Sequence, residues 1–326
     1  MKAIVYSEYG GPNVLRIEDV ALPTCASNEI LIQVKAAEAT KADCEMRSFR
    51  FSVLWFWLPL RLYLGLTVPK QPILGCYFSG KVIEIGPEAK TKLSVGDEVY
   101  GSSGLRLGGY GEYLALPDTA TLVRKPQNMT FPEAAAVPLG GLNALHFMQL
   151  ANIQQGDRVL IIGAGGSIGA HAVQIAKLMG AYVAAVDKTE KEAFVCQQGA
   201  DRFIDYTVED ILRSDEQFDV IFDMVPGSDY AKCLARLTES GRYLLGNARL
   251  SSIVRAVATN KVAGRKMVRV KFAAEKKEEL DQLSSMIEAG NLNPIVEHVF
   301  PMQEVGKAHE MVESETRNGA IVLEIS

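Results

Sequence analysis

Two patterns of hydrophobic and polar residues divide the chain. The first part contains short runs in which apolar and polar residues alternate, such as LRIEDVAL, EILIQVKAAEA and SGKVIEIG, separated by Gly, Pro and Asp turns. This alternation predicts half-buried strands in a compact, mostly antiparallel β domain. From about residue 125 the runs become continuously apolar, as in RVLIIGAG, YVAAVD and FDVIFDMV, and alternate with helical segments. Buried strands separated by helices predict a doubly wound parallel sheet.

The end of the chain departs from this second pattern. The segment VEHVFPMQEVGKAHEMVESETRNGAIVLEIS reads as strand, helix and strand, with no further crossover repeat, so we expect it to rejoin the first domain. The predicted fold class is α/β, with one domain formed by residues 1–124 and 275–326 and a central dinucleotide-binding domain formed by residues 125–274. A length of 326 residues agrees with two domains because it exceeds what one core usually organises.

Charge and cysteine usage exclude several classes of partner and compartment. The net charge is −5 and the basic residues are scattered, which predicts binding to neither nucleic acid nor a membrane surface. The opening MKAIVYSEYGG has no basic or apolar segment typical of a signal peptide, and the five cysteines form no CxxC pair. We therefore expect a cytoplasmic protein with reduced thiols.

One stretch, from Phe51 to Leu66, is unusually apolar and contains Trp55 and Trp57. It is too short to span a bilayer, and Pro59 and Arg61 interrupt it. We interpret it as an apolar insertion in the first domain. Two roles stay open for it: one wall of an acceptor pocket that suits a flat or lipophilic substrate, or a loop that caps the core of the small domain.

A glycine-rich loop follows the strand RVLII and opens the next helix. It reads Gly163-Ala164-Gly165-Gly166-Ser167-Ile168-Gly169. Glycines allow a tight turn and a close approach to a pyrophosphate, and the helix amino terminus offers N–H groups to the anion. Strand, loop, helix, second strand and a terminal acid, Asp187, follow in the order typical of a dinucleotide site. The predicted cofactor contacts from this loop are Gly163, Gly166, Ser167, Ile168 and Gly169.

The residues after the second strand bear on the choice between NADH and NADPH. The carboxylate of Asp187 would hydrogen-bond the adenosine ribose and repel a 2′-phosphate, which favours NADH. Lys188 and Lys191 follow within one turn and would pair with the 2′-phosphate of NADPH, with Tyr206 flanking the adenine, unless both lysines form a solvated face. We predict NAD(P)H as the cofactor, with a preference for NADH.

The chain resembles the medium-chain dehydrogenase/reductase superfamily, specifically its zinc-free quinone oxidoreductase (zeta-crystallin-like) branch. The resemblance covers essentially the whole chain and rests on MKAIVYSEYGGPNVLRIEDV, SVGDEVYG, AAAVPLGGLNALHF, the glycine loop, GADRFIDYTVED and VFPMQEVGKAHEMVESETRNGAIVLEI. It implies a GroES-like catalytic domain built from both chain ends and a central Rossmann domain. It also implies a homodimer joined through the Rossmann sheets, to which the alternating segment MVRVKFA would contribute an exposed edge.

The resemblance further implies that no catalytic metal is bound. Zinc-dependent members place a cysteine, a His-Glu pair and a further cysteine around the metal, and the matching positions here are Thr40, Cys76-Tyr77 and the Pro138-Leu139 region. Zinc needs about three Cys, His or carboxylate ligands, which Cys76 alone does not supply. Cys44 is displaced from the ligand position and is expected to be a packing thiol.

By motif match to this branch, five residues are expected near the nicotinamide: Thr40, Asp43, Tyr77, Asn143 and Asn247. Asn143 and Asn247 are candidates for cofactor binding as well as catalysis. Asn143 stands where the branch commonly has a threonine, whereas Asn247 follows the strand RYLLG at the edge where open α/β sheets bind ligands. Tyr77 either donates a proton or is a buried tyrosine satisfied by packing.

These expectations predict an NAD(P)H-dependent reductase. Without a Lewis acid, hydride needs a small-molecule electrophilic acceptor that is already electron-poor, such as a quinone or an α,β-unsaturated carbonyl. Two alternatives stay open: an alcohol dehydrogenase of the same superfamily, which the missing ligand set disfavours, and a non-catalytic nucleotide-binding redox sensor or structural protein.

Overall fold

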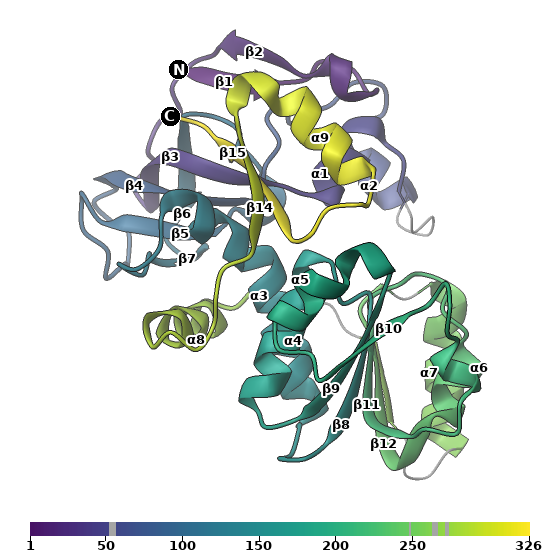
Figure 1. The fold of residues 1–326 in the computed structure, drawn as a ribbon. Helices are drawn as coiled ribbons and strands as arrows, with labels where there is room; N and C mark the ends of the chain where they lie inside the picture. The colour runs from purple at the N-terminus through teal and green to yellow at the C-terminus, as the bar shows by residue number, and fades with distance from the viewer. Residues whose placement is uncertain (52–56, 248, 263–266, 271–273) are drawn as a thin grey trace. The chain divides into compact units, whose positions relative to one another are not determined.

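The computed structural model describes residues 1–51, 57–247, 249–262, 267–270 and 274–326. The chain divides into two compact units, Met1–Leu139 with Glu275–Ser326 and Gly140–Ala274 (Figure 1). The predicted α/β fold class, with one unit built from both chain ends, is confirmed. The division between the units falls inside helix α3 (Phe131–Ala151), whereas the boundary expected at residues 124 and 125 stays a prediction.

The first unit is built on a sheet for which seven strands are described, in the order β14-β15-β3-β4-β5-β7, with β6 also paired to β3. The strands are β3 (Glu29–Ala39), β4 (Tyr77–Ile85), β5 (Glu98–Ser102), β6 (Tyr113–Pro117), β7 (Thr121–Arg124), β14 (Val296–Pro301) and β15 (Ala320–Glu324), beside a separate pair, β1 (Lys2–Val5) and β2 (Arg16–Asp19). Strand β15 runs antiparallel to β3 and places Val322 opposite Glu38. The last strand of the chain therefore completes a sheet that the first part began.

Short helices surround this sheet and close its core. They are α1 (Lys41–Ser48), α2 (Trp57–Leu64), α8 (Lys277–Glu288), α9 (Val305–Glu313) and the 3₁₀ turns at Pro12–Val14, Gly104–Arg106 and Met302–Glu304. Alternate residues of β3, namely Ile30, Ile32 and Val34, are buried in the main hydrophobic cluster of the unit. The period of two seen in the sequence thus reflects a strand with one face on the core.

The second unit is a parallel sheet in the order β10-β9-β8-β11-β12-β13. The strands are β8 (Arg158–Ile162), β9 (Tyr182–Asp187), β10 (Arg202–Asp205), β11 (Phe218–Asp223), β12 (Leu237–Leu245) and β13 (Met267–Val270). The helices are α4 (Ser167–Leu178), α5 (Glu192–Gln197), α6 (Tyr230–Ala235) and α7 (Leu250–Val262). Two 3₁₀ turns are formed by Thr189–Lys191 and Ile211–Arg213. Figure 1 shows α4 and α5 on one face of the sheet and α6 and α7 on the other. The strand order reverses between β8 and β11, and the carboxyl ends of strands at such a switch point form the usual ligand edge of a doubly wound sheet.

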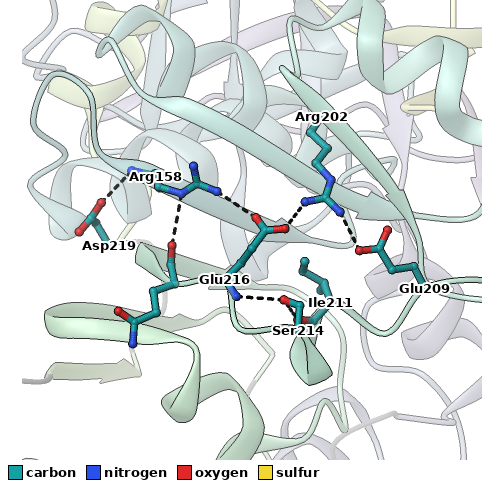
Figure 2. A network of polar contacts seen from close by, with 8 residues as sticks. Arg158, Arg202, Glu209, Ile211, Ser214, Glu216 and Asp219 are labelled. Atoms are coloured by element: carbon teal, nitrogen blue, oxygen red, sulfur yellow. Dashed lines mark hydrogen bonds and ion pairs between the residues drawn. The ribbon is translucent and has the colours of Figure 1, made fainter.

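The amino-terminal ends of strands β8 and β10 carry a network of ion pairs (Figure 2). Arg158 at the start of β8 and Arg202 at the start of β10 share the carboxylate of Glu216, with 2.9 Å between Arg158 Nη2 and Glu216 Oε2. Arg202 also contacts Glu209 Oε1 at 2.6 Å. All four side chains are partly exposed, so each pair is expected to stabilise the fold by about 1 kcal/mol or less.

A buried polar chain links α1 to α9 inside the first unit. Arg47 Nη1 lies 3.0 Å from His309 Nδ1, and because a guanidinium only donates, this ring nitrogen must accept. The remaining His309 Nε2–H therefore donates to the Tyr110 hydroxyl at 3.1 Å. Arg47 also donates to the carbonyl of Gly10 and pairs with Glu313. The imidazole is consequently held in its neutral form.

The first prediction concerns the pH dependence of stability. Burial, reinforced by the Arg47 charge, lowers the pKa of His309 from 6.5 to about 3. The unfolded chain therefore binds a proton that the folded chain does not, and this contribution to stability is lost as pH falls below 6.5. Between pH 7.5 and 5.5 the loss amounts to about 1.4 kcal/mol for one histidine.

Urea denaturation of the wild type and His309→Gln at both pH values measures this contribution. The difference between the two unfolding free energies should narrow by about 1.4 kcal/mol at pH 5.5, because only the wild type has the titrating ring. Comparing the two proteins cancels the other titrating groups. A difference that stays constant with pH would contradict the buried neutral assignment.

Candidate functional site

The glycine-rich loop turns sharply between β8 and α4. Gly163 has φ +84°, and the N–H groups of Gly163 and Ala164 donate to the carbonyl of Val186 at 3.0 and 3.2 Å. A Cβ on Gly169 would lie 2.2 Å from the Gly163 carbonyl oxygen, so only glycine fits there. Helix α4 begins after Gly166 without a side-chain cap, which leaves the N–H groups of its first turn directed at the loop. This arrangement suits a bound phosphate or pyrophosphate.

Asp187, at the end of β9, is bonded directly to this loop. Its Oδ2 accepts from the Gly165 N–H at 2.7 Å and its Oδ1 accepts from the Lys188 N–H at 2.9 Å. Lys191 is nearly buried, and its Cδ would be 2.3 Å from a Cβ on Gly165. The Tyr206 N–H donates to the Asp187 carbonyl at 3.3 Å. The structure therefore brings together four of the predicted elements: the loop, Asp187, Lys191 and Tyr206.

The other predicted cofactor residues of the second unit differ in their surroundings. The Asn247 amide donates to the carbonyl of Met224 at 2.9 Å, which places it at the carboxyl ends of β11 and β12, the expected ligand edge. Asn143 is half-buried on α3, and the side chain of Lys188 is exposed. The Ser167 hydroxyl would be 2.5 Å from a Cβ on Gly140, so it faces α3. Only the backbone N–H of Ser167 is therefore suited to an anion at the loop.

In the first unit, Thr40 and Asp43 form a reciprocal cap at the start of α1. The Asp43 N–H donates to Thr40 Oγ1 at 3.1 Å, and Asp43 Oδ2 accepts from the N–H and hydroxyl of Thr40 at 3.0 and 2.5 Å. Asp43 Oδ1 accepts from the Gly75 N–H at 3.0 Å. Burial raises the pKa of Asp43, while the hydrogen bonds from Thr40, Gly75 and Tyr110 lower it. Asp43 thus fixes the positions of its neighbours through bonds that use both of its oxygens.

Tyr77, at the start of β4, is bonded to Glu275, a residue that carries no motif in the sequence. Its hydroxyl donates to Glu275 Oε1 at 2.6 Å, and the Ser102 hydroxyl donates to Glu275 Oε2 at 2.6 Å. Burial and the adjacent Glu275 charge raise the pKa of Tyr77, so the phenol keeps its proton. No motif marks Glu275, because it stands in the charged run AAEKKEE, which reads as a solvated surface.

Glu38 is the second residue that sequence reasoning missed. It is fully buried on β3, and neither carboxylate oxygen has a hydrogen-bond partner in the part of the chain that the structure describes. It shares a face of the sheet with Ala36 and with Val322 opposite, and this face packs against Ala135 and Ala136 of α3. In the sequence, the alternation of EILIQVKAAEA makes Glu38 look like an outward polar position. The only available signal was a carboxylate two residues before the candidate Thr40.

The residues matched to zinc ligands do not form a metal site. Among the residues that the structure describes, no group of three or more His, Cys, Asp or Glu side chains is placed to hold a metal ion. The positions matched by the resemblance carry Thr40, Cys76-Tyr77 and the Pro138-Leu139 region. A threonine bonded to Asp43, one thiol with its neighbouring tyrosine, and a proline-leucine pair are not the donor set that zinc requires.

The fold and the glycine loop define a two-unit nucleotide-binding protein, and known proteins identify its family. Residues 26–127 match the alcohol dehydrogenase GroES-like domain, and residues 198–323 match the family described as zinc-binding dehydrogenase. An NADPH-dependent alkenal/one oxidoreductase of Arabidopsis thaliana is 30% identical over 336 residues, which cover 99% of this chain and 79% of that protein.

Two further relatives match almost end to end. A quinone oxidoreductase of Sus scrofa is 29% identical over 99% of this chain and 97% of its own. The solved structure of a quinone oxidoreductase from Coxiella burnetii is 29% identical and superimposes with a TM-score of 0.88, covering 100% of this chain and 99% of that one. The chain therefore belongs to the medium-chain dehydrogenase/reductase superfamily, in its quinone oxidoreductase branch, as predicted.

Proposed function

We propose that this chain is an NAD(P)H-dependent reductase that transfers hydride to a quinone or an α,β-unsaturated carbonyl without a metal. The observation that carries the proposal is the loop of the second unit, where an uncapped helix amino terminus and the Asp187 carboxylate lie together. The names of the relatives, alkenal/one oxidoreductase and quinone oxidoreductase, support this class of acceptor.

Each predicted residue has a proposed task. Gly163 would shape the turn and the N–H groups from Gly166 to Gly169 would hold the pyrophosphate, while Asp187, Lys188, Lys191 and Tyr206 would surround the adenosine end. Asn143 and Asn247 would contact the cofactor nearer its nicotinamide, which supplies the hydride when bound. In the first unit, Thr40 and Tyr77 would line the acceptor site and position the acceptor by contact, with Asp43 holding Thr40 and Glu275 holding Tyr77 in place.

We further propose a preference for NADH, assembly as a homodimer and a cytoplasmic location. The half-buried Asp187 supports the first, because a 2′-phosphate beside its carboxylate would face a like charge. Strand β13 is an edge of the sheet and supports pairing with a second copy. The five cysteines are all free thiols, which supports a reducing compartment.

The second prediction concerns Asp187. Asp187→Ser removes the charge but keeps an oxygen that can accept from the Gly165 N–H, so the loop should hold its shape. The ratio of kcat/KM for NADPH over that for NADH should rise about tenfold for each 1.4 kcal/mol of repulsion relieved.

A matched control is Asp205→Ser, which removes the corresponding carboxylate at the end of the neighbouring strand β10, where it is bonded to Thr189 and Thr207. This control should leave the cofactor ratio unchanged. If the wild type already prefers NADPH and Asp187→Ser does not alter that preference, the NADH proposal is wrong. Lys191→Ala would then be expected to weaken NADPH selectively.

The third prediction tests the reaction itself. Purified protein should oxidise NADH or NADPH in the presence of 1,2-naphthoquinone or simple enones, and dialysis against a strong chelator should leave the rate unchanged. A rate that disappears with the chelator and returns with zinc, together with oxidation of alcohols, would support an alcohol dehydrogenase. Cofactor binding without turnover of any acceptor would support a non-catalytic nucleotide-binding protein.

A further inference from the structure

Helix α2 of the first unit has apolar side chains on opposite sides. Leu60 and Leu64 pack on the hydrophobic core, as expected for a surface helix. Leu58 and Leu62, one turn apart, are instead about 60% exposed. Together with three exposed neighbours they form what we call the α2 surface: Leu58, Leu62, Tyr63, Leu66 and Val68. A run of exposed large apolar residues of this kind marks an interaction site.

Specific contacts hold the α2 surface in place. The Tyr63 hydroxyl donates to the carbonyl of Leu105 at 3.2 Å, and the Lys70 ammonium donates to the carbonyl of Leu62 at 2.9 Å. The Arg61 guanidinium lies 4.0 Å from the centre of the Phe49 ring. The leucines are therefore presented by a helix that is joined to the rest of the unit through Tyr63 and Arg61.

The charge around the α2 surface is opposite to that of the whole chain. Between Ser48 and Gln71 the chain has no Asp or Glu and three basic residues, Arg50, Arg61 and Lys70, whereas the preceding Arg47 is buried and paired with Glu313. The net charge of the chain is −5. Both tryptophans of the chain, Trp55 and Trp57, also belong to this segment. Trp55 and the side chain of Trp57 lie outside the described residues, so the predicted role of these rings as a pocket wall stays a prediction.

We propose that the α2 surface docks on an anionic lipid bilayer, with its leucines in the interfacial region and the basic side chains at the headgroups. Exposed leucines, adjacent tryptophans and cations without acids are the composition that favours an interfacial segment. No helix among the described residues is long and apolar enough to cross a membrane, so the contact is with one leaflet. The scattered charge that predicts no membrane partner for the whole chain does not apply to this segment.

A lipid surface explains the combination of exposed leucines and basic side chains better than a protein partner does. A protein interface has a polar rim, whereas the exposed charged residues of this segment, Arg50 and Lys70, are both basic. Each basic residue near an anionic surface adds to the attraction, and each leucine adds apolar burial. This proposal does not depend on the reaction, although a surface of this kind would give the protein access to lipophilic acceptors.

The fourth prediction uses the two tryptophans as reporters. Full-length protein is titrated with vesicles of phosphatidylcholine alone or mixed with phosphatidylglycerol, and tryptophan emission and co-sedimentation are measured. Emission should shift to shorter wavelength with the anionic vesicles, and added salt should reverse much of the binding. The double variant Leu58→Gln/Leu62→Gln should partition at least about tenfold more weakly, because two leucines no longer enter the interface.

The matched control changes exposed apolar residues of a different helix. Val254→Gln/Val257→Gln on α7 makes the same type of substitution at positions of similar exposure and should leave vesicle binding unchanged. Circular dichroism checks that both double variants are folded. Equal binding by the α2 variant and the wild type would overturn the proposal. So would a tryptophan shift that follows protein concentration without vesicles, since that would assign the surface to a second copy of the chain.

A second inference rests on the buried carboxyl of Glu38 and on the proposed function. The hydroxyls of the predicted candidates are already committed: Thr40 donates to Asp43 and Tyr77 donates to Glu275. Glu38 lies on the strand that leads into Thr40, and Ala37 beside it pairs with Phe78, the neighbour of Tyr77. Asp43 and Glu275 each accept hydrogen bonds, whereas both carboxyl oxygens of Glu38 lack a partner among the described residues. Such a group calls for an explanation such as a catalytic role.

We propose that Glu38 is a catalytic residue that donates the proton completing reduction of the acceptor. The Glu38 O–H bond breaks and a new bond forms between that proton and the acceptor, which has taken the electron pair of the hydride. The resulting carboxylate regains a proton from solvent, and NAD(P)H is the species oxidised. A carboxyl group held neutral by apolar surroundings is a known means of donating a proton near neutral pH.

The electrostatic surroundings agree with a protonated Glu38. Burial raises its pKa well above the usual range, Arg317 acts to lower it and Asp43 to raise it. The charged or titratable groups that interact with Glu38 are Arg317, Asp43, Cys76, Tyr77 and Tyr110. With one cation among them and a fully buried position, the neutral acid is favoured.

The fifth prediction compares Glu38→Gln with the wild type. The variant keeps the shape and neutrality of the acid but has no proton to give, so kcat should fall about a hundredfold or more while the Kd for the cofactor stays unchanged. The wild-type kcat should fall as pH rises through the pKa of Glu38, and the kcat of the variant should not show this pH-dependent fall. Glu279→Gln, which changes a buried acid beside Lys276 on α8, is the matched control and should behave as the wild type.

Infrared spectroscopy adds a readout that needs no turnover. The C=O stretch of protonated Glu38, absent from Glu38→Gln, should shift when a quinone or enone analogue binds. The role of Glu38 would be overturned if Glu38→Gln had the same kcat as a wild type that turns over. It would also be overturned if the C=O band did not shift when the analogue binds. If no acceptor is turned over by the wild type, the proposed function fails, and the infrared experiment still decides whether Glu38 contacts the acceptor.

Discussion

The first unit depends on one buried carboxylate, that of Asp43. Its oxygens accept from the backbone and hydroxyl of Thr40 and from the Gly75 N–H, and Tyr110 bonds to it from a third segment. Transferring a carboxylate from water to the protein interior costs free energy, and this cost is offset only if all of its hydrogen-bond donors are in place together. The start of α1, the turn before β4 and the segment before β6 are therefore coupled. Through Tyr110 and His309, α9 joins the same network.

The second unit uses a similar device at the ligand edge of its sheet. Asp223, at the end of β11, is buried and accepts from the Tyr243 hydroxyl at 2.8 Å and from the Val225 N–H at 2.9 Å. Asp187 accepts from the loop in the same way. In each case an acid shapes backbone by accepting N–H bonds. Glu38 differs from all three, because no donor of the described chain reaches it, and this difference is the reason for assigning it chemistry.

The sequence predicted the features that repeat along the chain or that depend on glycine. Continuous apolar runs gave the parallel sheet, and the spacing from Gly163 to Asp187 gave the loop and the acid that bonds to it. It did not predict Glu38, because burial of a strand position depends on what covers its face, here Ala135 and Ala136 from α3. Nor did it predict Glu275, whose partners Tyr77 and Ser102 come from strands far away in the chain. Such pairings are set by tertiary contacts that periodicity does not encode.

The pairing of β15 with β3 also has a consequence for biosynthesis. Ile321 lies opposite Ala39, and Ile321 and Leu323 belong to the core of the first unit. At typical ribosomal rates of about 5–20 residues per second, β3 waits roughly 15–60 s for its neighbour to be made. Throughout that interval the nascent chain has an unpaired strand edge and an unfilled core, whereas the second unit, which ends at Ala274, is complete before β15 is made. Chaperone binding during translation is therefore expected to concentrate on the first unit, which can close only after β15 has left the ribosome.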